Sequence, residues 1–259
     1  MGSPHLRPRY RMVADELRRR IAAGASPAGA LLPSETALMA EFRVSRGTVR
    51  EAISLLRAEG LVVTEHGRGS YARPALPVRR ITSERYGREL DQLRSGRPIE
   101  SPFPVNPDLP WSHYRLEKDF REVAATTTRA ELFDVEVGTP LLERRFVFHA
   151  YGLAQQMSTS CLLLEMVTGT PLVDPDGEPW PGETAAQLHR LGITVTGVRE
   201  RVRARMPDAD EVDMLQLPSG VPVVTVTRQT YAGDRVVEVA TDIVMPADRV
   251  ELDYWITVD

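Results

Sequence analysis

The first 72 residues carry the pattern that most restricts the fold: three amphipathic segments followed by two strand-like segments around a glycine-rich turn. Apolar side chains recur at helical spacing in residues 9–23, 34–42 and 45–59. Ser34 and Ser45 stand where a helix N-cap is expected. The strand-like segments are residues 61–64 and 70–72. Three helices ahead of a hairpin, with a short turn between the second and third helices, predict a winged helix-turn-helix.

Charge is unevenly distributed along the chain. Residues 1–80 contain 14 arginines and seven acidic residues, a net charge of +7, although the whole chain has a net charge of −4. Residues 81–259 therefore have a net charge of −11. A basic N-terminal domain on an acidic body favours a polyanion as the partner of that domain.

The third helical segment has an arginine stripe opposite its apolar side. Arg46, Arg50 and Arg57 fall within about 40° of one another at 100° per residue. In a helix-turn-helix, the N-terminal residues of the second helix of the motif meet base edges in the major groove. A guanidinium there can pair with O6 and N7 of guanine. We therefore expect Arg46 and Arg50 to read bases, and Arg57, two turns further along, to be solvated.

Other residues near this helix and in the turn suit phosphate or groove contacts. Small hydroxyls can reach phosphates, and a glycine turn with a basic side chain can enter a minor groove. The candidates are Ser45, Thr48, His66, Gly67 and Arg68.

The remainder of the chain predicts a second domain with mixed secondary structure. Six segments rich in β-branched and apolar residues predict strands at 114–122, 140–149, 154–162, 195–206, 221–231 and 235–245. Helices are expected at 84–95, 126–133, 183–190 and 208–215. This order predicts an α+β domain with a mostly antiparallel sheet. The predicted division is residues 8–73 for DNA binding, 74–81 as linker and 82–259 for the body.

Several classes of function find no support in the sequence. The single cysteine, Cys161, excludes an internal disulfide, and the five histidines show no pair at metal-ligand spacing. No nucleophile elbow or phosphate loop occurs. No apolar run approaches the ~20 residues of a spanning helix, and residues 1–11 lack the apolar core of a signal peptide. We expect a cytoplasmic protein with no catalytic residues, metal, cofactor or membrane partner.

The N-terminal motifs resemble those of GntR-type transcriptional regulators. The resemblance covers residues 9–73 and rests on four strings: Leu32-Pro33-Ser34-Glu35, residues 44–52 (Val-Ser-Arg-Gly-Thr-Val-Arg-Glu-Ala), Glu59-Gly60-Leu61 and Gly67-Arg68-Gly69-Ser70. In that family, positions matching Arg46, Arg50 and Gly67 contact DNA. The family often has arginine where this chain has Thr36, so contacts from the second helix are expected to be weaker or to reach only phosphate.

The body resembles the UTRA effector-binding domain of the HutC subfamily, from about residue 82 to 256. The cues include Val137-Gly138-Thr139-Pro140, Glu143-Arg144-Arg145 and the run from Leu217 to Val223. The resemblance implies a chorismate-lyase-like α+β fold without enzymatic activity. It also implies a homodimeric repressor that binds a near-palindromic DNA operator and releases it when a small-molecule effector binds.

The resemblance further suggests an effector site in the body. Its candidate residues are Arg144, Arg145, Ser158, Ser160, Arg228, Tyr231 and Glu238. Relatives that bind sugar phosphates use an Arg-x-Arg pair, but adjacent strand residues point to opposite faces, so at most one of Arg144 and Arg145 can point into the site. A register shifted by two would place Phe146 and Phe148 there instead. Either case weakens recognition of a phosphate, so we expect a less anionic, partly apolar or aromatic effector.

Two other functions remain open on the sequence alone. The body could be an enzyme of chorismate-lyase type fused to a DNA-binding domain. The protein could also be an architectural DNA binder without an effector, which predicts a body without a ligand-sized cavity.

Overall fold

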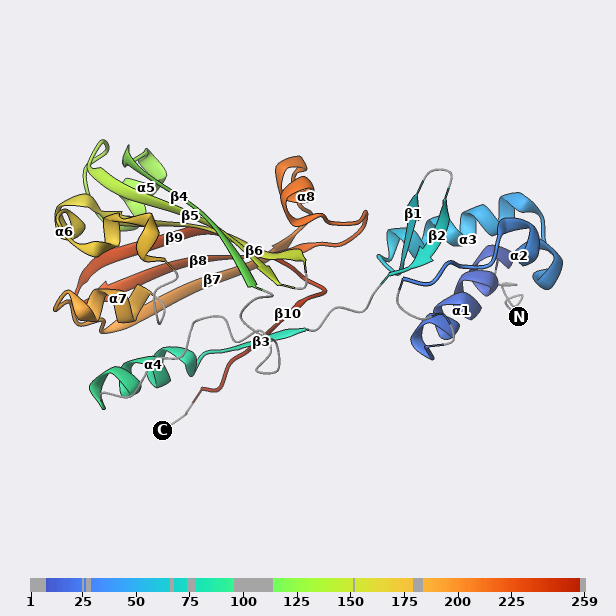
Figure 1. The fold of residues 1–259 in the computed structure, drawn as a ribbon, viewed down its shortest axis with the longest axis horizontal. Coiled ribbons are helices and arrows are strands. Elements are labelled where there is room, and N and C mark those ends of the chain that lie inside the picture. Colours follow the sequence, from blue (N-terminus) through green and yellow to red (C-terminus); the bar gives the residue numbers. More distant parts are fainter. Residues whose placement is uncertain are drawn as a thin grey trace, which may run out of the picture. The chain divides into compact units, whose positions relative to one another are not determined.

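The computed structural model describes residues 8–24, 26, 29–65, 68–73, 78–95, 114–150, 152–178 and 184–256. The chain divides into two compact units (Figure 1). The first is built mainly from residues 1–77, and the second mainly from residues 78–205 and 222–259.

The first unit begins with three helices whose ends follow from their capping residues. They are α1 (Arg9–Ala22), α2 (Glu35–Phe42) and α3 (Arg46–Ala58). Ser34 and Ser45 accept hydrogen bonds from the backbone N–H of Ala37 and Thr48, so both act as the N-caps that the sequence predicts. Arg43 ends α2 in the left-handed conformation, at φ 51°, which permits the sharp turn into α3.

A hairpin completes the first unit. Strand β1 (Val62–Glu65) pairs antiparallel with β2 (Gly69–Ala72). Gly69 has φ 112°, and a Cβ built on it would lie 2.8 Å from the Leu31 side chain. Glycine is therefore favoured at this position by its backbone conformation, and a larger residue would also have to displace the exposed Leu31 side chain.

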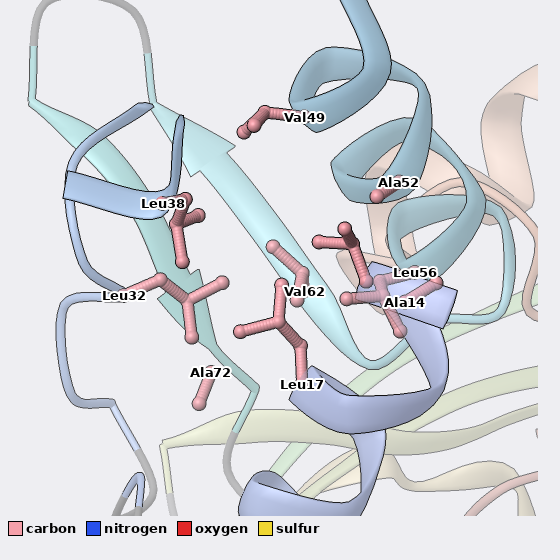
Figure 2. Close-up of a cluster of buried hydrophobic side chains, with 10 residues drawn as sticks. Ala14, Leu17, Leu32, Leu38, Val49, Ala52, Leu56, Val62 and Ala72 are labelled. Atoms are coloured by element: carbon pink, nitrogen blue, oxygen red, sulfur yellow. The ribbon is translucent and has the colours of Figure 1, made fainter. Parts of the chain in front are cut away.

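Figure 2 shows the apolar core between the helices and the hairpin of this unit. Leu17 of α1, Leu38 of α2, Leu56 of α3 and Val62 of β1 are all buried in one cluster. Because each helix contributes one apolar side, the polar side of α3 remains exposed. The predicted winged helix-turn-helix is confirmed.

The second unit is organised around a six-stranded antiparallel sheet. Its strands follow the order β4-β5-β6-β9-β8-β7. They are β4 (Tyr114–Ala124), β5 (Pro140–Ala150), β6 (Leu153–Leu163), β7 (Gly197–Arg205), β8 (Val223–Ala232) and β9 (Arg235–Pro246). Each strand falls within a few residues of its predicted position, and the α+β prediction is confirmed.

Helices cover both faces of this sheet. On one face, α5 (Thr127–Phe133) packs Ala130 and Phe133 against Leu141, Cys161 and Val239. We call this the α5 face. Side chains from alternate strand positions, such as Leu142 and Leu162, pack on the other face, with Leu188 of α7 (Thr184–Arg190). We call this the α7 face. Three short helices belong to it: α6 (Leu164–Val167), η2 (Pro171–Val173) and η3 (Pro175–Gly177).

Two short strands on the α7 face were not predicted. Strand β3 (Arg79–Thr82) pairs in parallel with β10 (Val250–Asp253), and α4 (Arg85–Arg94) follows β3. Ile81 and Val250 pack against Val226, Ile243 and Met245 of the large sheet. Residues 79–81, which the sequence analysis places in the linker, are thus part of a strand pair.

The last helix, α8 (Ala209–Leu215), lies between β7 and β8 in the sequence. Its entry is a reciprocal capping box: Asp208 Oδ1 accepts from the Glu211 backbone N–H at 2.9 Å, and Glu211 Oε2 accepts from the Asp208 N–H at 3.0 Å. The helix predicted at 208–215 is therefore confirmed at Ala209–Leu215, with Asp208 at its entry.

Candidate nucleic-acid interface and effector site

The exposed side of α3 presents the two arginines singled out by the sequence. Val49, Ala52 and Leu56 are fully buried, which orients the helix. Arg46 and Arg50, one turn apart, have side chains that are 64% and 72% exposed. They project from the N-terminal part of the helix, where a recognition helix meets base edges.

Glu35 of α2 lies next to both arginines. Its carboxylate is 3.6 Å from Arg46 Nε and 3.7 Å from Arg50 Nε, beyond hydrogen-bond distance. Such exposed ion pairs contribute little to stability. Both guanidinium groups can therefore leave Glu35 for a stronger acceptor such as a guanine edge or a phosphate.

Of the two hydroxyls expected at phosphates, that of Ser45 caps the helix and that of Thr48 contacts the Ser45 hydroxyl. Ser45 Oγ accepts from the Thr48 backbone N–H at 3.2 Å, and the two side-chain oxygens lie 2.9 Å apart. Thr36 is exposed on α2, and Arg57 is exposed near the end of α3. Capping thus orients the Ser45 and Thr48 hydroxyls at the N-terminus of α3, where backbone N–H groups favour anions.

The hairpin of β1 and β2 is the wing, and the structure describes the residues on both sides of its tip. Arg68 is 74% exposed and forms a 2.6 Å ion pair with Glu65, while its backbone carbonyl accepts from the Tyr71 hydroxyl at 3.1 Å. His66 and Gly67 lie outside the described residues. Arg68 is therefore available at the surface of the wing, as the sequence analysis expects.

In the second unit, the structure separates the two adjacent arginines of β5. Arg144 is on the α7 face and its side chain is 1% exposed. The side chain of Arg145 is 53% exposed, on the opposite face, where its Nε lies 2.9 Å from the buried carboxylate of Glu143. Arg129 also pairs with Glu143 there. One arginine of the pair thus points into the body, as strand alternation requires.

Arg144 is the centre of a buried polar cluster. Its Nη1 donates to Gln187 at 2.8 Å, and its Nη2 donates to Ser160 at 3.1 Å and to Thr184 at 3.3 Å. Its guanidinium also lies within 6 Å of two aromatic rings, at 5.9 Å from Phe120 and 5.7 Å from Phe146. Burial lowers the pKa of Arg144, but a guanidinium remains charged at neutral pH.

Glu238, fully buried on β9, is the carboxylate of this cluster. Its Oε1 accepts from Ser160 and Thr184, both at 2.8 Å, and from Arg228 at 3.3 Å. Its Oε2 accepts from Thr230 at 2.8 Å. Burial alone raises the pKa of Glu238, but the charges of Arg228 and Arg144 and the hydroxyl donors outweigh burial and lower it. Glu238 is therefore ionised and fully occupied by the protein's own donors.

The structure gathers most, but not all, of the predicted effector residues. Arg144, Ser160, Arg228 and Glu238 belong to this cluster. Ser158 lies opposite Phe146 on the neighbouring strand and is half-buried. Its side chain has no hydrogen bond among the described residues. Tyr231 packs instead with the apolar cluster beneath α5, where Arg199 lies 5.8 Å from its ring. Arg145 and Tyr231 are thus on the α5 face, apart from the others.

Four members of the cluster were missed by the sequence analysis: Thr184, Gln187, Thr230 and Glu178, which lies 3.7 Å from Arg144. Thr184 and Gln187 come from α7, and Thr230 comes from β8. Thr184 and Gln187 are three residues apart, so they share a side of α7, but polar residues at that spacing usually face solvent. Only the position of α7 against the sheet reveals their role.

Cys161 is buried on the α5 face, and burial raises the pKa of its thiol to about 11. The thiol is therefore protonated at neutral pH and a poor nucleophile. We expect it to react with dithionitrobenzoate only when the second unit opens, so labelling followed by absorbance should be slow in buffer and complete in denaturant. Fast labelling of the native protein would contradict this burial.

In the described part of the chain, no group of three or more His, Cys, Asp and Glu side chains is placed to hold a metal ion. Across those residues, no helix is both long and apolar enough to cross a membrane.

Comparisons with known proteins agree with this architecture. Residues 9–71 match the gntR family of bacterial regulatory proteins, and residues 118–251 match the UTRA domain. An HTH-type transcriptional regulator of Streptomyces coelicolor is 29% identical over 241 residues, covering 91% of this chain and 88% of that protein. The Escherichia coli mannosyl-D-glycerate transport/metabolism system repressor MngR is 42% identical over 89 residues, 34% of this chain and 33% of that protein.

Solved structures extend the likeness to the whole chain. A crystal structure of a GntR-family transcriptional regulator is 30% identical, with a TM-score of 0.65, over 98% of this chain and 99% of that chain. PhnF from Mycobacterium smegmatis, at 20% identity and a TM-score of 0.53, shares the fold over 95% of this chain and 100% of its own. The chain belongs to the gntR family of bacterial regulatory proteins and carries a UTRA domain at residues 118–251.

Proposed function

We propose that this protein is a ligand-responsive repressor of the HutC subfamily. It binds its operator as a homodimer through the first unit and releases it when a small molecule binds the second unit. The main support for a small-molecule site is that Arg144 is fully buried while its Nε has no hydrogen-bond partner among the described residues. The names of similar proteins, which include repressors, support the direction of regulation.

The DNA-binding half rests on the exposed side of α3. Each protomer inserts the N-terminal end of α3 into a major groove, so that Arg46 and Arg50 reach base edges. Arg68 and the wing tip, His66 and Gly67, lie along the neighbouring backbone or minor groove. Two protomers on two half-sites about one helical turn apart read a near-palindromic operator.

The effector site lies on the α7 face, around Arg144, Ser158 and Ser160. Charged side chains continue from it across the sheet: Arg228 pairs with Glu238, and Glu200, opposite Arg228 on β7, pairs with Arg85 at 2.5 Å. Arg85 begins α4, which follows β3 and the predicted linker. Effector binding can therefore bias the segment that leads to the DNA-binding unit, provided that the effector binds the released state better than the bound state.

The test is titration of the protein–operator complex with candidate metabolites, read by fluorescence anisotropy of labelled DNA. The expected result is release at saturating metabolite, with the metabolite recovered unchanged by chromatography. Conversion of the metabolite would instead favour the enzyme of chorismate-lyase type. Operator binding that no metabolite alters, together with no metabolite binding to the free protein, would favour an architectural DNA binder.

Salt dependence provides a second measurement. Because the basic first unit neutralises phosphates, the logarithm of the association constant should fall linearly with the logarithm of salt concentration. For contacts with about 6–10 phosphates per dimer, affinity should fall roughly 10³–10⁵-fold between about 50 and 200 mM salt. A flat response, measured by anisotropy with the same duplex, would be incompatible with binding through this surface.

A further inference from the structure

The effector site already contains an anion supplied by the chain itself. Glu178 follows η3 and its side chain is 9% exposed. Its Oε1 lies 3.7 Å from Nη1 of Arg144 and accepts from Gln187 Nε2 at 3.0 Å. Its backbone carbonyl accepts from Lys118 Nζ at 2.9 Å. Glu178 is therefore held beside Arg144, close enough to balance its charge but too far to hydrogen-bond to it.

The hydrogen bonds of Arg144 are incomplete. A guanidinium has five N–H groups, and three of those of Arg144 donate, all to neutral oxygens of Gln187, Ser160 and Thr184. Within the described residues, Nε has no acceptor although it is buried. An unsatisfied buried donor is costly, and a charged one more so. The site thus retains unused capacity for an acceptor that approaches more closely than Glu178.

The charge balance indicates how many charges that acceptor should carry. Among the described residues, Arg144 and Arg228 are the cations of the cluster and Glu238 and Glu178 are its anions, with Lys118 bonded to the Glu178 backbone at the edge. Glu238 attracts both arginines, but its oxygens already accept from Arg228 and three hydroxyls, so Glu178 is the carboxylate beside Arg144 that an incoming anion can replace. Replacing Glu178 by one negative charge keeps the net charge of the site unchanged, whereas a neutral molecule would leave the buried site with one uncompensated positive charge more than before.

We propose that Glu178 is a built-in competitor of the effector, and that the effector is a singly charged anion, such as a carboxylate, which displaces the Glu178 side chain and hydrogen-bonds to Arg144. This inference rests on the proposed function, because it places the effector at the same site. Phe120 and Phe146, whose rings contact each other, lie beside the guanidinium and offer a surface for the apolar part of such an anion. Competition by Glu178 weakens the apparent affinity, so that release of DNA requires an effector able to overcome it.

The experiment measures binding of benzoate, and of its neutral analogue benzamide, to the full chain without DNA by titration calorimetry. Benzoate should bind the unmodified protein, and Glu178→Gln should lower its Kd about tenfold or more, because the competing charge is gone. Glu131→Gln, which removes an exposed charge from α5, is the matched control and should leave the Kd unchanged. Arg144→Lys should abolish benzoate binding, and benzamide should bind none of these proteins.

Three results would overturn the inference: equal benzoate affinity in Glu178→Gln and the unmodified protein, benzamide binding as tight as benzoate, or no benzoate binding to Glu178→Gln. The key result is a gain of affinity, which a misfolded variant cannot produce. Because DNA is absent, failure here leaves metabolite-driven operator release intact. Conversely, tighter anion binding without an effect on any protein–DNA complex would retain an anion site in competition with Glu178 but refute its role as the effector site, and with it the proposed function.

Discussion

Replacing Arg46 or Arg50 by alanine should cost about 1–3 kcal/mol of operator binding per half-site, because each loses a two-point contact with guanine. In a dimer both half-sites are affected, so a single substitution should weaken binding by roughly 30-fold to 10⁴-fold. The measurement is anisotropy titration with a duplex selected by the unmodified protein from a random pool, compared with an unselected duplex of equal length. Affinity for the selected duplex should fall much more than affinity for the unselected one.

Arg57→Ala is the matched control for this prediction. Arg57 is also an exposed arginine on α3, but it lies two turns beyond the end that we propose enters the groove. Its loss should change binding to both duplexes by a similar, small factor. If Arg46→Ala and Arg57→Ala were equivalent on the selected duplex, the arginines would be phosphate contacts and α3 would not read bases.

The first unit was predictable because its signals are local. Ser34 and Ser45 cap the helices in which they were placed, and the buried positions of α3 follow the helical period of its apolar residues. The same local chemistry explains Gly69 of the Gly-Arg-Gly-Ser turn, whose φ of 112° favours glycine. The motif that resembles DNA-binding relatives therefore contains residues that the hairpin needs for its structure as well as residues that could contact DNA.

The second unit was predictable in its elements but not in its site. Strand alternation already required Arg144 and Arg145 to point to opposite faces of the sheet. Which of the two is buried depended on where α5 and α7 pack, and this could not be read from the sequence. Ser160 and Glu238 are far apart in sequence and meet because β6 and β9 are neighbours in the sheet. The pair β3–β10 joins the two ends of the body, and four-residue strands carry too little pattern to be recognised without their partners.

Replacing Glu238 by glutamine should lower the free energy of unfolding of the second unit by about 3–5 kcal/mol, the usual cost of removing one partner of a buried ion pair. The variant keeps the shape of the side chain but leaves Arg228 and Arg144 without their carboxylate. Urea unfolding, followed by exposure of the Cys161 thiol, reports on this unit specifically, because Cys161 lies in its core. Glu165→Gln removes an exposed partner of Arg235 and should cost less than about 1 kcal/mol.

The unmodified protein and the Glu238→Gln variant should also differ in how their stability depends on pH. The pKa of Glu238 is lower in the folded protein than its ordinary value of 4.5, so the carboxylate contributes its full stabilisation above that value. As the pH falls below about 4.5, the unfolded chain takes up the proton first, and the contribution declines until the folded-state pKa is reached. The difference in unfolding free energy between the unmodified protein and Glu238→Gln should therefore be constant near neutrality and shrink in acid. A difference that stays the same down to low pH would mean that the charge of Glu238 does not stabilise the cluster around Arg144 and Arg228.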